Sequence, residues 1–367
     1  MQLQQHKDTK INAFLSSIGR NSKNSRKSYY TGLSHFIKFL KHQKQTSDNI
    51  IPPLQLGQMN VYELLDQFVS YLIKHRINPA SLKTYMAVVR SFLEYYDIDI
   101  SSTKFKRKVK MPKYYADPEE PITLSDIRTL LEYNNNHRLR TFLLLLTSSG
   151  VRAMEGCSLR LQDMDFTVSP TRINIRYAVT KTKRGRVIYC SDETTKHIHK
   201  LIDMHNIKAP NDLIFSVQGS IQPITIYNRI LEQFEKLQKV AGKDQRKENS
   251  KRREITLHSF RRANYSIISE NCSSDFANWF LGHHHSTYWT HKESERREIY
   301  RTKCMPFLTV YQETRDNTIE ATLKEKDRTI KLLTNRMADI EHNQKIMQNL
   351  LRDPELLRKK LNQSRKG

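Results

Sequence analysis

Four side chains between Leu257 and Tyr288 have the chemistry to bind and cleave a phosphodiester. His258 and Arg261 stand three positions apart, so on a helix they share one face and can point at the same target. His283, in a Leu-Gly-His triplet, and Tyr288 follow in the same stretch. Arginine binds phosphate oxygens through its planar fork, histidine can donate hydrogen bonds, and a tyrosine oxygen can attack phosphorus. These residue types predict phosphoryl transfer, although a basic helix with surface histidines would show the same short pattern.

The charge of the whole chain indicates a polyanionic partner. Among 367 residues, Lys and Arg number 62 and Asp and Glu number 38, which gives a net charge of +24. Such an excess favours nucleic acid. The sequence has no apolar run of about 18 residues, no lipidation motif and no apolar leader, so we expect neither a membrane span nor secretion. The cysteines are far apart, so we expect reduced intracellular thiols, without disulfides or a zinc site.

Apolar periodicity predicts a mainly α protein with a small antiparallel β-sheet, arranged in five segments. Residues 1–19 are polar and are expected to be a flexible N-terminus. Residues 20–100 show helical spacing typical of a compact bundle. Residues 101–121 are basic and then Pro-rich, as in a linker, and residues 122–315 alternate helical patterns with one hairpin. The tail, residues 316–367, differs from all of them.

The tail carries a heptad pattern that predicts a coiled coil. Lys326 and Gln344 interrupt it, and a long amphipathic helix packed back on the body is the alternative. The apolar a and d positions are Ile319, Leu323, Ile330, Leu333, Met337, Ile340, Met347 and Leu351.

Basic residues of the bundle and the linker are candidates for binding a phosphate backbone. A solvated basic face is the alternative, and the charge of the whole chain favours backbone contacts. The candidates are Lys23, Arg26, Lys27, Lys83, Arg90, Lys104, Lys106, Arg107, Lys108 and Lys110.

Several boxes, taken together, resemble those of the tyrosine recombinases, the family of the phage-type integrases. Within that family the resemblance is to archaeal integrases. The stretch SSGVRAMEGCSLRLQDMDF resembles the box with the first catalytic arginine, which is Arg152 here. LHSFRR resembles the HxxR box and implies His258 and Arg261, and LGH implies His283. The order of these residues along the chain is the family order, and the combination is far more specific than any one box.

The same resemblance implies a catalytic lysine in the hairpin that precedes Cys190. Aligning Arg186-Val187-Ile188 with the usual end of that hairpin gives Lys181, with Lys183 as the alternative.

The nucleophile is the one place where the sequence departs from the family pattern. That pattern places the tyrosine further from the LGH histidine, where Lys292 stands here. We assign Tyr288, with Tyr300 and Tyr311 as rivals. Trp289 precedes a Thr-His pair as the usual tyrosine does, so a dead enzyme, or one that takes a tyrosine from another protomer, is the remaining alternative.

The resemblance covers residues 20–312 and implies both a fold and an activity. The fold would be a helical SAM-like core-binding domain, which binds DNA, and an α+β catalytic domain. The activity would be site-specific recombination through a 3′-phosphotyrosyl intermediate, for integration or excision of a mobile element. Double-stranded DNA and a homo-oligomer on DNA, a tetrameric synapse, would be the partners, in the cytoplasm at the nucleoid. A type IB topoisomerase-like nicking-closing enzyme and a dead DNA-binding homologue are the alternatives.

In the implied mechanism each residue has one task. Arg152 and Arg261 clamp the non-bridging oxygens, as metal ions do in other nucleases. Lys181 protonates the leaving 5′ oxygen, His258 acts as base or as phosphate donor, and His283 donates to a non-bridging oxygen. No cofactor and no metal are implied.

A metal site built on the nearby histidines is the weaker alternative. His284 and His285 are neighbours in the chain and diverge in direction, so with His291 they make a poor ligand set.

Overall fold

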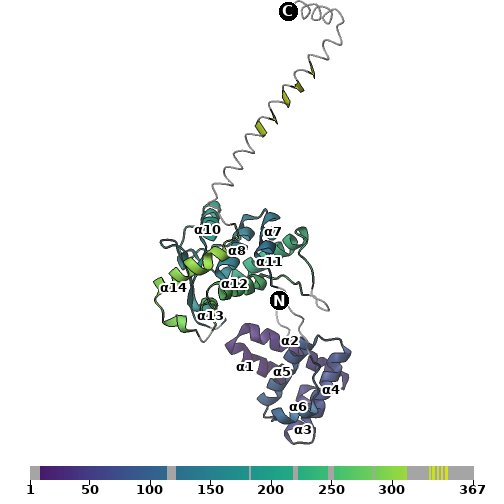
Figure 1. The fold of residues 1–367 in the computed structure, drawn as a ribbon. Coiled ribbons are helices and arrows are strands. Elements are labelled where there is room, and N and C mark those ends of the chain that lie inside the picture. The colour runs from purple at the N-terminus through teal and green to yellow at the C-terminus, as the bar shows by residue number, and fades with distance from the viewer. Residues whose placement is uncertain are drawn as a thin grey trace, which may run out of the picture. The chain divides into compact units, whose positions relative to one another are not determined.

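The computed structural model describes residues 9–113, 121–181, 183–217, 222–246, 252–283 and 286–311, with scattered positions between 330 and 345. Contacts within the chain divide it into two compact units, residues 1–118 and 119–367 (Figure 1). Each unit has its own hydrophobic core. The residues with candidate chemistry all belong to the second unit.

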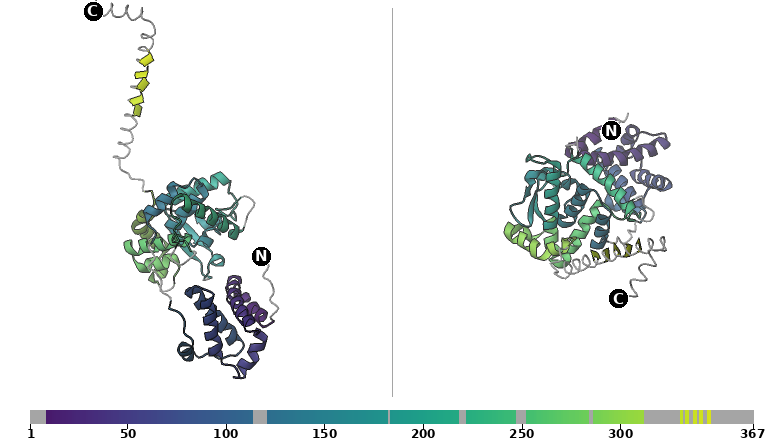
Figure 2. Two further views of the ribbon diagram at one scale, coloured as in Figure 1. Left: turned by 90° about the vertical axis from the view of Figure 1, so that its right-hand side faces the viewer. Right: turned by 90° about the horizontal axis from the view of Figure 1, so that it is seen from above.

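The first unit is a bundle of helices around aromatic side chains. The ring of Phe36 meets the edge of Phe68 at 5.2 Å between centroids, and Phe14 meets Phe92 at 5.6 Å. Figure 2 shows these helices, purple to blue, from two further sides. The helices are α1 (Thr9–Asn21), α2 (Lys23–His42), α3 (Ser47–Gln55), α4 (Val61–Lys74), α5 (Pro79–Tyr95) and α6 (Ser102–Lys108).

Two helices of this unit lie in segments for which the sequence predicted none. The segment expected to be a flexible N-terminus contains α1, because Ile11, Phe14 and Leu15 form an apolar stripe at helical spacing and are buried. The segment expected to be a linker begins with α6, where Phe105 is buried against the bundle. Both helices are mostly polar, and three buried residues in α1 and one in α6 are enough to hold them against the bundle.

The second unit combines helices with one small sheet. Its short turns are η1 (Leu161–Asp163), η2 (Tyr177–Val179), η3 (Thr287–Thr290) and the π-helical η4 (Tyr300–Cys304). Its helices are α7 (Leu124–Glu132), α8 (His137–Ser149), α9 (Ala153–Gly156), α10 (Asp192–His205), α11 (Pro223–Val240), α12 (Leu257–Asn271), α13 (Ser274–Leu281), α14 (Glu293–Ile299) and α15 (Met305–Leu308).

The sheet is antiparallel, with strands β1 (Met164–Asp165), β2 (Thr171–Ile175) and β3 (Arg186–Cys190) in that order. Ile173 pairs with Ile188, which sets the register of the hairpin. The predicted mainly α fold with a small antiparallel sheet is therefore confirmed. Ten residues lie between the end of β2 and the start of β3, so the hairpin connection is much longer than a two-residue turn.

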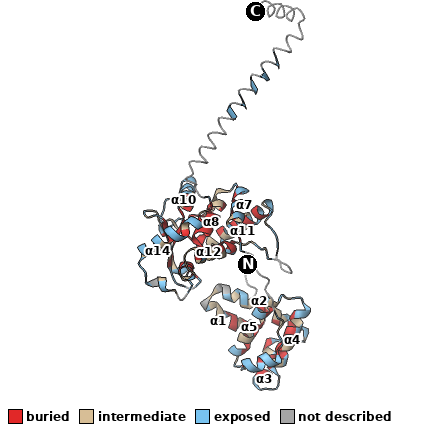
Figure 3. Cartoon of the chain, viewed as in Figure 1, coloured by how far each residue is buried: buried red, intermediate tan, exposed pale blue. Residues whose placement is uncertain are grey.

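Helix α8 forms the centre of the second unit and leads directly into the candidate site. Its residues from Thr141 to Ser149 are all buried, as the red ribbon of Figure 3 shows. The helix ends at Gly150, whose φ of 59° is left-handed. A Cβ there would lie 2.5 Å from the Asn264 side chain and 2.5 Å from that of Leu281. Only glycine therefore lets α12 and α13 pack so closely against the end of α8.

Within the described part of the chain, no helix is long and apolar enough to cross a membrane.

The described residues of the tail are helical and leave the heptad side chains uncovered. Ile330, Leu333, Met337 and Ile340 are between 53 and 64% exposed. In a coiled coil, apolar residues at these positions are buried against a partner helix. The coiled coil itself stays a prediction, and the other heptad positions of the tail lie outside the described residues.

Candidate active site

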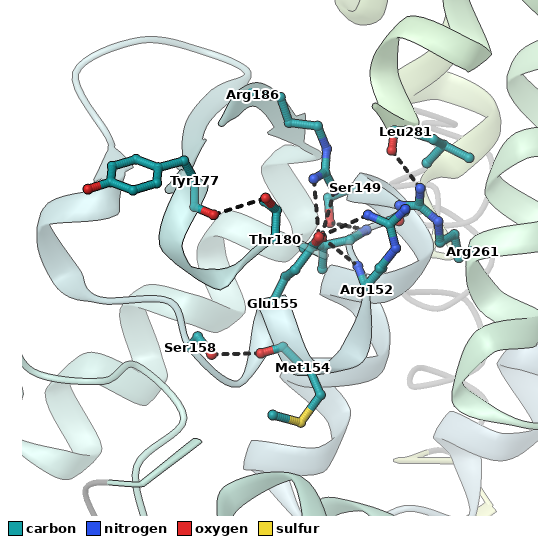
Figure 4. Close-up of polar contacts among 12 residues, drawn as sticks. Ser149, Arg152, Met154, Glu155, Ser158, Tyr177, Thr180, Arg186, Arg261 and Leu281 are labelled. Carbon is teal, nitrogen blue, oxygen red and sulfur yellow. Dashed lines mark hydrogen bonds and ion pairs between the residues drawn. The ribbon is translucent and has the colours of Figure 1, made fainter. Parts of the chain in front are cut away.

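The buried carboxylate of Glu155 binds two arginine side chains. Glu155, 1% exposed, accepts hydrogen bonds from Arg186 at 2.7 and 3.3 Å and from the Arg152 guanidinium at 2.9 Å (Figure 4). The backbone N–H of Arg152 also donates to it, at 3.2 Å. Burial raises the pKa of Glu155, but the hydrogen bonds and charge of Arg186 and Arg152 outweigh burial and leave it lowered. Glu155 is therefore ionised at neutral pH.

Arg261 joins the two chain segments that flank this carboxylate. It donates from Nη1 to the carbonyl oxygen of Gly150 at 2.6 Å and from Nη2 to that of Leu281 at 2.5 Å. The side chain is buried between α8 and α13. Burial, and then the charges of Arg152 and Arg186, lower its pKa to about 9.

Two guanidinium groups thus bind a single carboxylate, and the guanidinium of Arg261 lies near them. We call Arg152, Arg186, Arg261 and Glu155 the arginine cluster. Next to burial, the charges of Arg152 and Arg186 lower the pKa of Arg261, and an anion would relieve that repulsion. Arg152 is the member that solvent reaches, with 29% of its side chain exposed, whereas Arg186 is only 4% exposed. A phosphate bound here would meet Arg152 first.

His258 lies exposed in the first turn of α12, one turn before Arg261. Burial, followed by the charges of Arg261, Arg252 and Arg152, lowers the pKa of its imidazole. The neutral ring is therefore the dominant form at neutral pH, and it can accept a proton.

His283 is fixed by the C-terminal turn of α13. Gly282, with a φ of 74°, ends the helix, and the His283 N–H donates to the Asn278 carbonyl at 2.8 Å. The ring Nδ1 lies 3.1 Å from the amide oxygen of Asn278, a contact that orients the imidazole.

The two candidate lysines lie on the connection between β2 and β3. Both are exposed, and within the described residues neither contacts the arginine cluster. Lys181 follows Thr180, which is buried and donates from its hydroxyl to the Tyr177 carbonyl at 3.0 Å. Lys183 has a left-handed φ of 54°. Its backbone N–H donates to the Thr180 carbonyl at 3.4 Å, so the described contacts hold the backbone near both lysines.

Tyr288 lies in a short segment that is attached to the other end of α13. We call residues 286–291 the nucleophile segment. Asp275, in the first turn of α13, accepts from the backbone N–H of Thr287 at 3.1 Å and from its hydroxyl. The ring of Tyr288 packs against Phe276 at 5.2 Å and stacks on His291 at 4.7 Å. An eight-residue helix separates its ends by roughly 12 Å, and no described contact joins Tyr288 to the arginine cluster.

The rival tyrosines have other partners. The hydroxyl of Tyr300 is fully buried and donates to the Ser148 carbonyl at 2.9 Å, and burial raises its pKa well above the usual value. Such a hydroxyl cannot reach DNA without unfolding the core. Tyr311 is 37% exposed, and its backbone N–H donates to Glu193 at 3.0 Å. The side chain of Trp289 lies outside the described residues.

Most of the predicted DNA-binding residues are exposed in the first unit, although some also pack within it. The Arg90 guanidinium lies 4.6 Å from the ring centroid of Phe105 and 3.5 Å from Glu94, so part of its donor capacity is used internally. Lys108 lies 6.0 Å from the ring of Tyr62. The side chain of Lys23 lies outside the described residues. The exposed candidates are Lys27, Lys83, Lys104, Lys106, Arg107, Lys108 and Lys110, and Arg26 and Arg90 are half-buried.

Sequence reasoning missed Arg186, Asn278 and Asp275, which orient the assigned residues. A signal existed for Arg186, because strand alternation places it on the same face as Ile188 and Cys190. An arginine on the inward face of a strand needs a buried counterion. The contacts of Asn278 and Asp275 depend on how α13 ends and begins, and no sequence pattern indicates them.

Among the described residues, no group of three or more His, Cys, Asp and Glu side chains could hold a metal ion. His284 and His285, which the weaker metal alternative needs, lie outside the described part.

Comparison with known proteins gives one family and a consistent set of relatives. The model of the phage integrase family matches residues 120–292. A tyrosine recombinase of Pseudothermotoga lettingae is 26% identical over 60% of this chain and 73% of its own length. The tyrosine recombinase XerD of Rickettsia bellii is 26% identical over 54% of this chain and 66% of its own length. A probable integrase/recombinase of Acholeplasma phage L2 is 25% identical over 66% of this chain and 76% of its own length.

Solved structures share the fold at low sequence identity. A lambda integrase dimer bound to a core site superposes with a TM-score of 0.55 at 14% identity, covering 77% of this chain and 97% of that one. The XerH recombinase bound to its difH substrate gives a TM-score of 0.53 at 15% identity, over 82% and 85% of the two chains. At these identities the likeness establishes the fold alone.

Proposed function

Because the chain belongs to the phage integrase family of tyrosine recombinases, we propose that it is a site-specific DNA recombinase. It cleaves and rejoins DNA through a 3′-phosphotyrosyl intermediate, in the integration or excision of a mobile element. The observation that carries this proposal is the arginine cluster, in which Arg152 and Arg186 share one carboxylate and the buried guanidinium of Arg261 lies near both. A preorganised excess of positive charge is what stabilises the extra negative charge of a phosphoryl-transfer transition state.

In the cleavage step the tyrosine oxygen of Tyr288 attacks phosphorus as the bond from phosphorus to the 5′ oxygen breaks. The phenolic proton passes to His258, whose neutral ring can accept it. A lysine of the hairpin connection donates a proton to the leaving 5′ oxygen. Rejoining reverses the step, with a 5′ hydroxyl attacking the phosphotyrosine, so the bond energy is kept and no external energy source is consumed.

The clamp on the phosphate comes from both arginines named by the sequence. Arg152 exposes its guanidinium, so its remaining N–H groups can bind a non-bridging oxygen. Each terminal nitrogen of Arg261 donates one N–H to a backbone carbonyl. The guanidinium has further N–H groups that can bind a non-bridging oxygen. His283 donates to a non-bridging oxygen as well.

The choice between Lys181 and Lys183 is open to a chemical test. A substrate with sulfur in place of the bridging 5′ oxygen has a leaving group that needs no proton. That substrate should restore the cleavage rate of the variant that lacks the proton donor. We expect rescue for Lys181→Ala and none for Lys183→Ala, whose rate should be near that of the wild type. The reverse pattern would move the assignment to Lys183.

The proposed partners are double-stranded DNA and further copies of the chain. Related solved structures include an integrase dimer on a core site and a tetramer on a Holliday junction, and a similar homo-oligomer on DNA is part of this proposal. The exposed basic residues of α2, α5 and α6 would bind the phosphate backbone. Action on DNA would place the protein at the nucleoid.

The test begins with a pool of randomised duplexes, because such a pool contains many different candidate recognition sites at once. DNA that stays attached to protein after denaturation in detergent is recovered and sequenced. We expect covalent capture of one preferred sequence, and strand exchange between two duplexes that carry it. Covalent capture without strand exchange would indicate a topoisomerase-like enzyme. Sequence-selective binding without covalent capture would indicate a dead DNA-binding homologue.

A further inference from the structure

Arg186 connects three parts of the site, although it is absent from the set of residues assigned to the reaction. It is the first residue of β3 and directly follows the connection that carries Lys181 and Lys183. Its side chain is 4% exposed and binds both oxygens of Glu155, at 2.7 and 3.3 Å. Figure 4 shows it reaching Glu155 from the strand, while Arg152 approaches the carboxylate from another side.

Through Glu155, Arg186 fixes the position of Arg152. The same carboxylate accepts from the Arg152 guanidinium at 2.9 Å and from the Arg152 backbone N–H at 3.2 Å. If Arg186 were lost, Glu155 would keep only its partly exposed partner, and a buried carboxylate with an unfilled acceptor reorients or draws in water. Arg152 would then lose the geometry in which it meets the phosphate.

Arg186 also lies against the turn that carries His283. A Cβ on Gly282 would lie 2.7 Å from Cδ of Arg186 and 3.2 Å from its Nε, so glycine is required for this approach. The preceding Leu281 carbonyl is the one that accepts from Arg261 at 2.5 Å. The side chain thus fills the space between Glu155 and the end of α13.

Packing alone is a poor reason to have an arginine at this position. Within the described residues, the buried Nε of Arg186 has no hydrogen-bond partner. A buried ion pair contributes little net stability compared with apolar residues of similar size. An arginine instead brings a fork that holds a carboxylate in one orientation.

We infer that Arg186 is a positioning residue of the recombination site, which acts through Glu155 to hold Arg152 in place against a bound phosphate. This inference rests on the proposed function. It implies that the hairpin strand and the phosphate clamp move as one body, since Arg186 belongs to the first and its carboxylate partner to the second.

The test compares Arg186→Met, which keeps the aliphatic stem and removes the fork, with a matched variant, Arg176→Met. Arg176 also forms a half-buried ion pair beside the sheet, with Asp163 at 3.0 Å, and it makes no contact with Glu155. We expect Arg186→Met to lower the saturated single-turnover cleavage rate about 100-fold, the order of loss for a misplaced catalytic group. The apparent Kd for DNA should change less than about threefold. Arg176→Met should leave the cleavage rate near that of the wild type.

Two further measurements separate positioning from stability. Glu155→Gln combined with Arg186→Met should be no slower than Arg186→Met alone, because both changes break the same link. The substrate with a bridging 5′ sulfur should not rescue Arg186→Met, because the defect lies at the non-bridging oxygens. Rescue by that substrate would overturn the inference and place the action of Arg186 on the hairpin lysine.

Arg186→Lys covers the case in which Arg186→Met does not fold. Lysine keeps the charge but cannot hold both carboxylate oxygens, so we expect a folded protein that cleaves at least tenfold more slowly. A folded Arg186→Lys protein that cleaves at the wild-type rate would show that Arg186 is structural only. If the wild-type chain forms no covalent adduct at all, the proposed function fails instead, and that outcome is visible before any variant is made.

Discussion

The arginine cluster and the nucleophile segment lie at opposite ends of α13 and are held in different ways. Arg261 is buried and bound to two backbone carbonyls, and Glu155 is bound by two arginines. The nucleophile segment is attached through hydrogen bonds to the half-buried Asp275 and through the packing of Tyr288 on Phe276. The arginine cluster is therefore preformed by buried bonds, whereas Tyr288 is held by the hydrogen bonds to Asp275 and by the packing of its ring on Phe276 and His291. To attack a phosphate at the cluster, Tyr288 must approach from the far end of the helix, or another protomer must supply the tyrosine.

The largest effect should follow from loss of the nucleophilic oxygen. Tyr288→Phe should abolish covalent attachment to DNA and leave binding intact, as measured by detergent-resistant adducts and by gel shift. Tyr300→Phe is the control: it should still cleave, while losing about 1 to 2 kcal/mol of stability because the Ser148 carbonyl loses its donor. An adduct that survives in Tyr288→Phe and disappears in Tyr300→Phe or Tyr311→Phe would contradict the assignment.

Loss of the clamp should cost less than loss of the nucleophile. Arg152→Ala and Arg261→Ala should each raise the cleavage barrier by about 3 to 4 kcal/mol, the usual cost of removing a preorganised donor. The two variants should differ in the midpoint temperature of thermal unfolding. Arg261→Ala should also destabilise the fold, because the Gly150 and Leu281 carbonyls lose their donors, whereas Arg152 is partly exposed. Equal unfolding midpoints for the two variants would show that the clamp is not preformed by Arg261.

A smaller effect should appear in the pH dependence of cleavage. The pKa of His258 is lowered, so the ring stays neutral in the free enzyme until the pH falls below the usual value for histidine. As a base, it should support cleavage at neutral pH, with the rate at low DNA concentration falling as the pH drops through that lowered pKa. His258→Asn should remove this acid limb. A rate that rises in acid would show that His258 acts as a protonated donor.

The tail should affect assembly more than chemistry, since all the assigned catalytic residues precede it. Deleting residues 316–367, or placing Glu at Leu333 and Ile340, should lower the oligomer mass measured by light scattering. Recombination should fall severalfold while cleavage at a single site stays near the wild-type rate. A truncated chain that assembles and recombines like the full one would exclude this role.

The smallest expected effect is that of a chelator, which should leave the cleavage rate unchanged, because the arginines supply the charge that a metal ion would otherwise bring. Strict dependence of covalent adduct formation on a divalent cation would contradict the proposed mechanism.

The fold could be predicted where apolar spacing was strong and was missed where it was sparse. The helical stripes of α4 and α5 and the alternation of β2 and β3 were sufficient, because each buries several residues per element. Helices α1 and α6 were missed because their charged and polar residues outnumber the few buried ones. Their stability depends on packing against the bundle, and a single segment of sequence carries little of that information.

The sequence by itself determined which residue types could act on a phosphodiester and that the partner is polyanionic, because charge and functional groups belong to single residues. Only the tertiary structure decided that Arg152 and Arg186 share the carboxylate of Glu155, and that Arg261 joins Gly150 to Leu281. It also removed Tyr300, whose hydroxyl is buried on Ser148. The bonds from Arg261 to Gly150 and from Tyr300 to Ser148 join residues more than a hundred positions apart. They depend on how the helices pack, and no local pattern encodes that packing.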